Sequence, residues 1–208
     1  MRNADLAAIW QYHDDTKHSV ERLQRNRHVL DWEIQPLPYK IYRDLEPLPL
    51  PRDWPPSDVP ALEAIALSGA TAVPITSAEA AMAVTPALTS VARLLLFSAG
   101  VTRKTVYAGG RAMHFRAAAC TGALYHIDLY LVCGALPGLD PGVYHFGPHD
   151  FALRRLRAGD YRALVVEATG GEPAVAAAPA IVVSASTFWR NAWKYQARAY
   201  RHCFWDEG

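Results

Sequence analysis

The chain has 208 residues, of which 51% are hydrophobic, and its 21 Lys and Arg residues nearly balance its 20 Asp and Glu residues. This apolar fraction supports a packed core, so a wholly disordered chain is excluded. The balanced charge argues against a nucleic-acid partner, which needs a strongly basic face. No apolar run approaches the roughly 20 residues that span a bilayer, and no secretory signal or membrane partner is indicated. Because the three cysteines are scattered, reduced thiols in a cytoplasmic protein are expected.

The first sixty residues differ in composition from the rest. Residues 15–30 are polar and charged, with apolar residues loosely spaced for one helical face. Residues 31–60 contain eight prolines, which disfavour regular helix. The same segment contains four aromatic residues: Trp32, Tyr39, Tyr42 and Trp54. We therefore predict domains at 1–60, an N-terminal helix with an extended arm packed onto a globular body, and at 61–208.

The middle of the chain predicts a helix and several strands. Pro86 precedes apolar residues at helical spacing, which predicts a helix over 87–99 that ends at Gly100. A basic, glycine-containing loop is expected to follow it. Apolar, β-branched runs predict further elements. These are strands at 127–133, 143–146 and 180–186, the last of them central, and a segment at 161–168 that is compatible with a helix.

The C-terminal segment 188–206 has the pattern of one long helix. Bulky residues fall on one stripe, namely Trp189, Trp193, Ala197, Tyr200 and Phe204. Basic residues fall on a neighbouring stripe, namely Arg190, Lys194, Arg198 and Arg201. Such a stripe is most often a solvated face, but a lysine partly desolvated beside tryptophans can act as a base. Helices with a few strands, not strictly alternating, predict an α+β fold.

A run of very small residues follows Arg116. Residues 117–123 read Ala-Ala-Ala-Cys-Thr-Gly-Ala, which lets a flat ligand or another backbone approach closely, and Gly122 permits a positive φ. Arg116 could face a phosphate or the electron-rich edge of a ring. The alternative is a tight loop packed under a helix, with Arg116 in an ordinary ion pair. Composition alone favours this alternative.

Two other candidate sites are weaker. His145 and His149 are four residues apart, but Gly147 and Pro148 exclude a shared helical face, so we predict no metal site. Cys120 as a nucleophile would need a base such as His114 or His126, and an inert cysteine is favoured. The sequence also has no phosphate-binding glycine motif and no serine nucleophile motif.

Segments along nearly the whole chain carry a family resemblance. They are Tyr12-His13, Thr16-Lys17-His18-Ser19, Pro38-Tyr39-Lys40-Ile41-Tyr42, Leu48-Pro49-Leu50-Pro51, Leu94–Val101, Phe115–Tyr125, Leu129-Tyr130-Leu131-Val132, Gly142-Val143-Tyr144-His145 and Trp193–Arg201. In this order they resemble the SagB-type dehydrogenases of the nitroreductase-like, FMN-dependent oxidoreductase superfamily.

The resemblance implies a nitroreductase-like α+β domain that binds FMN at the interface of two such domains, in a homodimer or a tandem repeat. It implies that the small-residue loop lies against the flavin, through Arg116, Ala119, Cys120, Thr121, Gly122 and Ala123. Lys194 and Tyr195 resemble the Lys-Tyr pair that removes a proton in azoline-oxidising members. The implied function is hydride transfer between FMN and a small molecule or modified peptide, with azoline-to-azole oxidation as one such reaction.

Three departures from the family pattern support an alternative. An arginine-rich segment that contacts FMN in the family corresponds here to residues 66–85, which contain no cationic residue. Ala119-Cys120 replaces the usual Pro-Ser, and His126 replaces a common proline. The family also continues past the end of this chain, so an incomplete fold is expected. The alternative is a non-catalytic half-domain that completes the flavin site of a second nitroreductase-like domain or subunit.

Overall fold

The computed structural model describes residues 6–25, 28–56, 58–70, 85–110 and 112–207. The chain forms two compact units, each assembled from separate segments. The first unit comprises Met1–Lys40, Ala119–Asp128 and Ser186–Gly208, and the second comprises Ile41–Ala118 and Leu129–Ala185. The division into domains at residue 60 stays a prediction. Among the described helices, none combines the length and apolar character that crossing a membrane requires.

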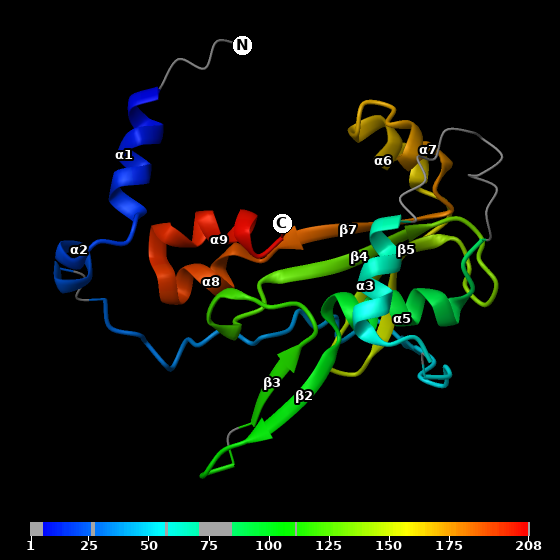
Figure 1. Ribbon diagram of the computed structural model, residues 1–208, viewed down its shortest axis with the longest axis horizontal. Coiled ribbons are helices and arrows are strands. Elements are labelled where there is room, and N and C mark those ends of the chain that lie inside the picture. Colours follow the sequence, from blue (N-terminus) through cyan, green and yellow to red (C-terminus); the bar gives the residue numbers. More distant parts are fainter. Residues whose placement is uncertain (1–5, 26–27, 57, 71–84, 111, 208) are drawn as a thin grey trace. The chain divides into compact units, whose positions relative to one another are not determined.

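A five-stranded sheet with the order β1-β6-β5-β4-β7 organises the second unit (Figure 1). Its strands are β1 (Pro47–Pro49), β4 (Ile127–Cys133), β5 (Gly142–Gly147), β6 (Ala152–Ala158) and β7 (Ala180–Ser186). The pairs β1/β6, β6/β5 and β5/β4 are antiparallel. In this register His145 of β5 lies between Tyr130 of β4 and Arg154 of β6.

The buried strands were predictable from their apolar runs. The expected strands at 127–133 and 180–186 have the observed bounds of β4 and β7, and β5 extends the expected strand 143–146 by one residue at each end. The predicted central position of β7 is wrong, because β7 ends the order of the described strands. Strand β6 was not predicted, because its Ala-Leu-Arg-Arg-Leu-Arg-Ala sequence lacks a continuous apolar run.

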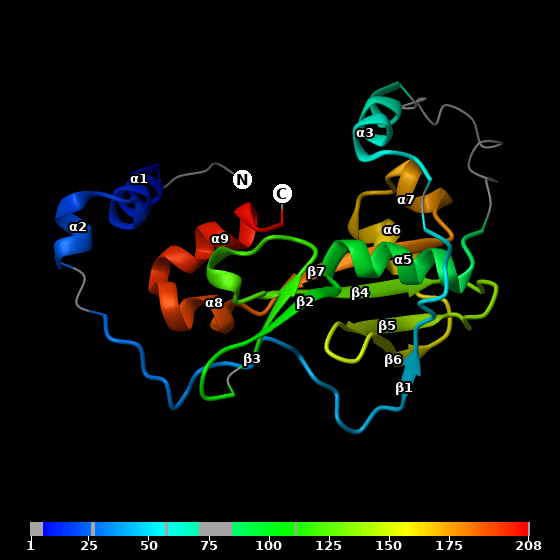
Figure 2. The same cartoon turned by 60° about the horizontal axis from the view of Figure 1, so that its bottom comes forward.

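Helix α5 (Leu88–Ala99) lies along the sheet (Figure 2) and confirms the predicted helix. Its buried face is formed by Val91, Ala92, Leu95 and Ala99. Gly100 ends the helix as expected, but its φ of −69° is not the left-handed conformation of a glycine cap. Glycine is favoured there for space, because a Cβ atom would lie 2.6 Å from the Leu96 side chain.

The segment expected to be a basic loop is instead an antiparallel hairpin of β2 (Val101–Val106) and β3 (Ala112–Arg116). Its β-branched residues favour strands, and its basic residues obscured that signal. Within the described residues, the second unit also contains the short helices α3 (Ala61–Ala70), α6 (Arg162–Ala168) and α7 (Pro173–Ala177). Most of the segment 66–85 that lacks cationic residues lies outside the described residues.

The first unit is helical. Its described helices and turns are α1 (Leu6–Thr16), α2 (Val20–Arg25), the 3₁₀ turn η1 (Thr121–Ala123), α8 (Phe188–Tyr195), the 3₁₀ turn η2 (Gln196–Arg198) and α9 (Ala199–Trp205). Helix α1 is joined to the C-terminal helices by bonds from Tyr12 Oη to the Ala197 carbonyl (3.0 Å) and from Arg201 Nε to Thr16 Oγ1 (2.7 Å). Trp193 Nε1 donates to the Asp31 carbonyl (2.8 Å), which holds the start of the extended arm.

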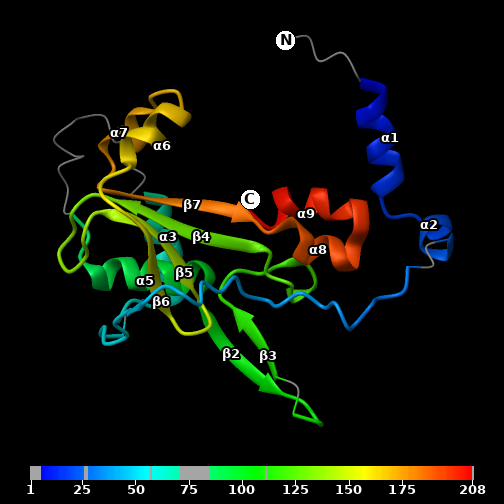
Figure 3. The same cartoon turned by 180° about the vertical axis from the view of Figure 1, so that it is seen from behind.

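The prediction of one helix over 188–206 is wrong. Figure 3 shows α8 and α9 as successive, separate helices. The break falls at Gln196, whose φ of 51° and ψ of −136° are not helical. The two predicted stripes are therefore interrupted: Trp193 is buried while Tyr200 is exposed, and Arg190 of the basic stripe is buried. A periodicity argument assumes one continuous axis and could not detect this break.

The described part of the arm 31–60 contains one regular element, the short strand β1. In the second unit, its residues pack on Phe151. The Leu50 N–H donates to the Phe151 carbonyl (3.1 Å), and the Arg52 guanidinium lies 4.1 Å from the centroid of the Phe151 ring. The Trp54 ring meets the same ring edge to face. The proline-rich arm is thus extended and packed, as predicted.

Candidate functional site

The loop that follows the alanine run has an unusual backbone. Gly122, Ala123 and Tyr125 have φ values of 67°, 54° and 50°. For residues other than glycine this left-handed conformation costs roughly 1–2 kcal/mol each. Ala123 and Tyr125 hold it only because the surrounding structure compensates. Two charged side chains make the principal contacts to this loop.

The carboxylate of Asp206, just after α9, is the first of these anchors. Its Oδ2 atom accepts hydrogen bonds from Thr121 N (3.0 Å), the Cys120 thiol (3.1 Å) and His126 Nε2 (2.9 Å). Its Oδ1 atom accepts one from Thr121 Oγ1 (2.6 Å). Burial by itself would raise the pKa of Asp206, but these hydrogen bonds outweigh it and leave the pKa below its ordinary value. Asp206 is therefore ionised at neutral pH.

Arg190 of α8 is the second anchor. Its Nη1 atom donates to the Tyr125 carbonyl (2.5 Å) and to Asp128 Oδ1 (3.2 Å). Thr187 Oγ1 donates to the other carboxylate oxygen of Asp128 (2.6 Å). Both charged side chains are 3% exposed. A buried pair of this kind is tolerated only when both groups are well hydrogen-bonded, so Arg190 holds the loop in one position.

Tyr195, the last residue of α8, lies against Gly122. A Cβ atom added to Gly122 would overlap the Tyr195 hydroxyl and lie 3.2 Å from its ring carbons. The Tyr195 ring meets the His202 ring edge to face, with centroids 4.7 Å apart. His202 is held in turn by Asn191, with Nδ1 2.6 Å from Oδ1. Burial lowers the pKa of His202, so it is neutral at pH 7 and gives Tyr195 an uncharged support.

Lys194 places a cation beside Tyr195. Its Nζ atom lies 5.3 Å from the centroid of the Tyr195 ring, and the side chain is half-buried. Among the residues that the structure describes, no carboxylate forms an ion pair with this ammonium group. Lys194, Tyr195 and Gly122 thus form one group within the first unit.

The other residues expected to line a flavin are placed differently. Ala119 is exposed and Ala123 is half-buried, and each has only a methyl side chain at the surface of the loop. The polar atoms of Cys120 and Thr121 are directed to Asp206. Arg116 belongs to the second unit, where it ends β3 opposite Val101 and is buried.

The structure favours the inert interpretation of Cys120. Burial, together with the hydrogen bond and negative charge of Asp206, raises the pKa of its thiol to about 11. The thiolate is the nucleophilic form of cysteine, so this thiol is unreactive at neutral pH. His126, one of the two bases considered for it, binds Asp206 through Nε2 and Ser186 Oγ through Nδ1 (2.9 Å each).

His145 and His149 do not form a shared site. The His145 ring packs against Tyr42 and Tyr130, with centroid distances of 4.9 and 5.3 Å. His149 faces Asp150 instead, at 3.6 Å.

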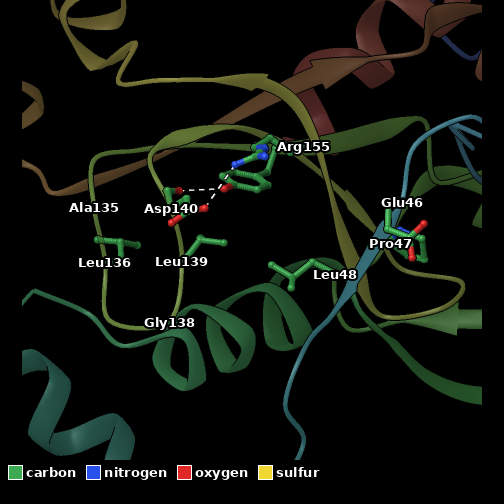
Figure 4. Close-up of a pocket in the computed structure, with 10 residues that line it drawn as sticks. Glu46, Pro47, Leu48, Ala135, Leu136, Gly138, Leu139, Asp140 and Arg155 are labelled. Atoms are coloured by element: carbon green, nitrogen blue, oxygen red, sulfur yellow. Dashed lines mark hydrogen bonds and ion pairs between the residues drawn. The ribbon is translucent and has the colours of Figure 1, made fainter.

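A separate hollow of about 640 Å³ lies in the second unit (Figure 4). It is lined by Glu46, Pro47, Leu48, Ala135, Leu136, Gly138, Leu139, Asp140, Tyr144 and Arg155. Arg155 pairs with the Asp140 carboxylate (3.4 Å), and Tyr144 Oη donates to the Asp140 carbonyl (2.8 Å). None of the residues predicted to bind flavin or to catalyse lines this hollow.

Sequence reasoning missed the residues that hold the site together. Asp206 and His202 fall within the pattern read as one long helix, and Arg190 was assigned to a basic stripe. Arg190 lies 62 positions from its partner Asp128, and Asp206 lies 86 positions from its partner Cys120. No local pattern reports such contacts. The one available signal was the acidic residue Asp206 near a helix C-terminus, where the helix dipole disfavours an anion.

The sequence matches no protein-family model and no curated protein. Its fold resembles that of solved structures. A nitroreductase-like protein from Anabaena variabilis aligns with 95% of this chain at a TM-score of 0.70 and 26% identity. This chain spans 35% of the length of that protein. The α+β fold is therefore nitroreductase-like, as the sequence predicted.

Two further solved structures align less closely. One is a nitroreductase-like protein from Ralstonia eutropha, with a TM-score of 0.43 and 22% identity. The alignment covers 82% of this chain and 74% of the Ralstonia chain. The other is the E. coli microcin synthetase McbBCD complex with truncated pro-MccB17 bound, with a TM-score of 0.45 and 17% identity. That alignment covers 100% of this chain and 76% of the chain in that structure.

We predict that Asp206→Asn destabilises the chain by about 1–3 kcal/mol at neutral pH in the presence of a chelator, because an amide cannot accept all of the hydrogen bonds that the carboxylate accepts. The neighbouring, exposed Glu207→Gln is the matched control and should change stability by less than about 0.5 kcal/mol. Urea unfolding followed by circular dichroism measures both. Equal effects would show that Asp206 does not anchor the loop.

Proposed function

We propose that this chain contributes to the active site of an FMN-dependent oxidoreductase of the SagB type. Hydride would pass between the flavin and a small molecule or a modified peptide, with azoline-to-azole oxidation as one candidate reaction. The similarity in fold to a nitroreductase-like protein supports the oxidoreductase class. The assignment of cofactor, substrate and residue roles is our inference from the arrangement of the first unit.

The observation that carries this proposal is the contact of Tyr195 with Gly122, beside Lys194. These residues are 73 positions apart in the sequence but adjacent in the first unit (195 against 122). A tyrosine hydroxyl and a lysine amine are both competent in proton transfer, and the glycine gives that hydroxyl room. Acid–base groups next to an accessible, small-residue surface are what a carbon-acid oxidation requires.

The residues beside Tyr195 fit a planar cofactor in part. Ala119 and Gly122 are exposed and small, so a flat ring could approach their backbone, and a Cβ at Gly122 would fill that space. Cys120 and Thr121 would support this surface from within, through Asp206. When bound there, FMN would supply the hydride acceptor. The phosphate would require cationic or backbone donors in addition to these residues.

In this arrangement Lys194 and Tyr195 would move the proton. Removal of a proton from a carbon acid requires a base within hydrogen-bond reach of the substrate, and the two groups could share that proton. The ring of Tyr195 is held by His202, which limits how far the hydroxyl can move. Lys194 lacks a carboxylate partner among the described residues, so no ion pair must break before it acts.

The alternative function is that of a non-catalytic half-domain. It would complete the flavin site of a second nitroreductase-like domain or subunit. One observation favours this alternative: residues 66–85 contain no cation to hold a phosphate. Flavin retention by the isolated chain separates the two functions.

We expect the purified chain, incubated with FMN and then desalted, to keep a flavin absorbance band in the visible spectrum. The physical reason is the accessible, small-residue surface beside Tyr195. A colourless but folded chain, as judged by circular dichroism, would contradict a complete site and support the half-domain function. Recovery of flavin after mixing with a nitroreductase-like partner would then identify the missing half.

We predict that Lys194→Ala lowers turnover of a thiazoline-containing peptide by at least about 100-fold, the usual contribution of a general base, while the flavin band is retained. Lys104→Ala, which removes an exposed lysine on β2, is the control and should leave turnover unchanged. Simultaneous loss of flavin and turnover in Lys194→Ala would assign Lys194 to cofactor binding or to structure.

A third variant tests the space beside Tyr195. Gly122→Ala and Gly110→Ala both place a side chain at a positive φ (67° and 81°), which should cost each about 1 kcal/mol. Only the new Cβ at position 122 would meet Tyr195, since nothing lies within 4 Å of the one at position 110. We therefore expect Gly122→Ala alone to lose flavin retention or turnover. Equal flavin retention and turnover in both variants would show that the contact between Gly122 and Tyr195 is not part of the active site.

A further inference from the structure

We propose that Cys120, His126 and Asp206 form a three-ligand site for a divalent transition-metal ion, with Zn²⁺ as the best match. The Cys120 Sγ atom, one imidazole nitrogen of His126 and one carboxylate oxygen of Asp206 all lie within 4.8 Å of one another. Thiolate, imidazole and carboxylate are the three ligand types that zinc takes in proteins. This site is separate from the flavin proposal and was not predicted from the sequence, which indicated no metal site.

The distances between the ligand atoms are close to those that zinc requires. Asp206 Oδ2 lies 3.1 Å from Cys120 Sγ and 2.9 Å from His126 Nε2. Tetrahedral zinc, with bonds of about 2.0–2.3 Å, separates its ligand atoms by about 3.4–3.6 Å. The Asp206 oxygen would therefore move away from each of the other two atoms by only about half an ångström.

The ligand side chains are hydrogen-bonded by groups of the kind that orient metal ligands in proteins. His126 Nδ1 lies 2.9 Å from Ser186 Oγ, and Nε2 faces Asp206. In the metal-bound form the ring proton would lie on Nδ1 and be donated to Ser186 Oγ, so that Nε2, which donates to Asp206 in the absence of the ion, becomes the unprotonated metal ligand. The second oxygen of Asp206 accepts from Thr121 Oγ1 at 2.6 Å. Metal-binding histidines and carboxylates are oriented by such outer hydrogen bonds. Both orienting partners are already in place.

The sulfur of Cys120 also has a suitable environment. The Tyr125 N–H group donates to Cys120 Sγ at 3.0 Å, an interaction that stabilises a thiolate. A thiolate beside the Asp206 carboxylate is unfavourable unless a proton or a cation lies between them. A divalent cation at this point would remove the repulsion between the two anions and could replace the shared proton.

Burial shields the site while leaving one side accessible. His126 is 0% exposed and the Asp206 side chain is 8% exposed, whereas Cys120 is half-buried. Three protein ligands leave the fourth position of a tetrahedral ion for water or another small ligand. The bound ion would tie the end of α9 to the strained loop that also presents Gly122 to Tyr195.

Cobalt substitution tests this proposal. The full chain is treated with a chelator, dialysed and titrated with Co²⁺, whose bond to a thiolate gives an intense near-ultraviolet charge-transfer band. We expect one equivalent of Co²⁺, displaced by one equivalent of Zn²⁺. The band should disappear in Cys120→Ala and persist in Cys203→Ala. Absence of the band from the wild-type chain, or its persistence in Cys120→Ala, overturns the proposal.

Two further measurements keep the test decisive if Cys120→Ala does not fold. Ser186→Ala removes the hydrogen bond behind His126 and a second one to Cys203 Sγ. Because Cys203 is not a ligand, we expect the loss of the first bond to weaken Zn²⁺ binding about tenfold or more. In the wild-type chain at alkaline pH, where part of the Cys120 thiol ionises and alkylation becomes measurable, Zn²⁺ should slow alkylation of Cys120, mapped by peptide mass, without slowing that of Cys203. Unchanged alkylation of Cys120 at saturating Zn²⁺ would exclude it as a ligand.

Discussion

The carboxylate of Asp206 is the interaction on which the candidate site depends. It accepts hydrogen bonds from the thiol, the hydroxyl, the imidazole and one backbone amide of a single loop. That loop contains Ala123 and Tyr125 in a conformation that neither residue adopts at low cost. From the other side, Arg190 fixes the Tyr125 carbonyl. Two opposite charges thus hold a short strained segment, and within it Gly122 lies against Tyr195.

The break at Gln196 makes this arrangement possible. Tyr195 lies against Gly122, whereas Asp206 binds the adjacent residue, Thr121. In one continuous α-helix, residues eleven positions apart would be separated by about 16 Å along the axis. They could not then reach neighbouring residues of one loop. Because Gln196 adopts a positive φ, α9 starts in a new direction and both side chains can approach the loop.

The same loop accounts for both proposals. Its small residues form the surface offered to a flavin, and the polar side chains beneath them form the candidate zinc site. These roles use different atoms: the exposed backbone around Gly122 on one hand, and the Cys120, His126 and Asp206 side chains on the other. Loops supported by rigid elements commonly carry function, because their conformation is decided by contacts and not by a regular backbone pattern.

The sequence by itself determined the elements whose signal is local: the strands β4 and β7, the helix α5, the extended proline-rich arm and the α+β class. A run of apolar residues or a helical period reports burial at that place in the chain, whatever surrounds it. The tertiary structure alone decided the β2–β3 hairpin, the break at Gln196 and the convergence of Tyr195, Asp206 and the loop. Those features arise from contacts between residues far apart in sequence, where burial and hydrogen bonding override local propensity.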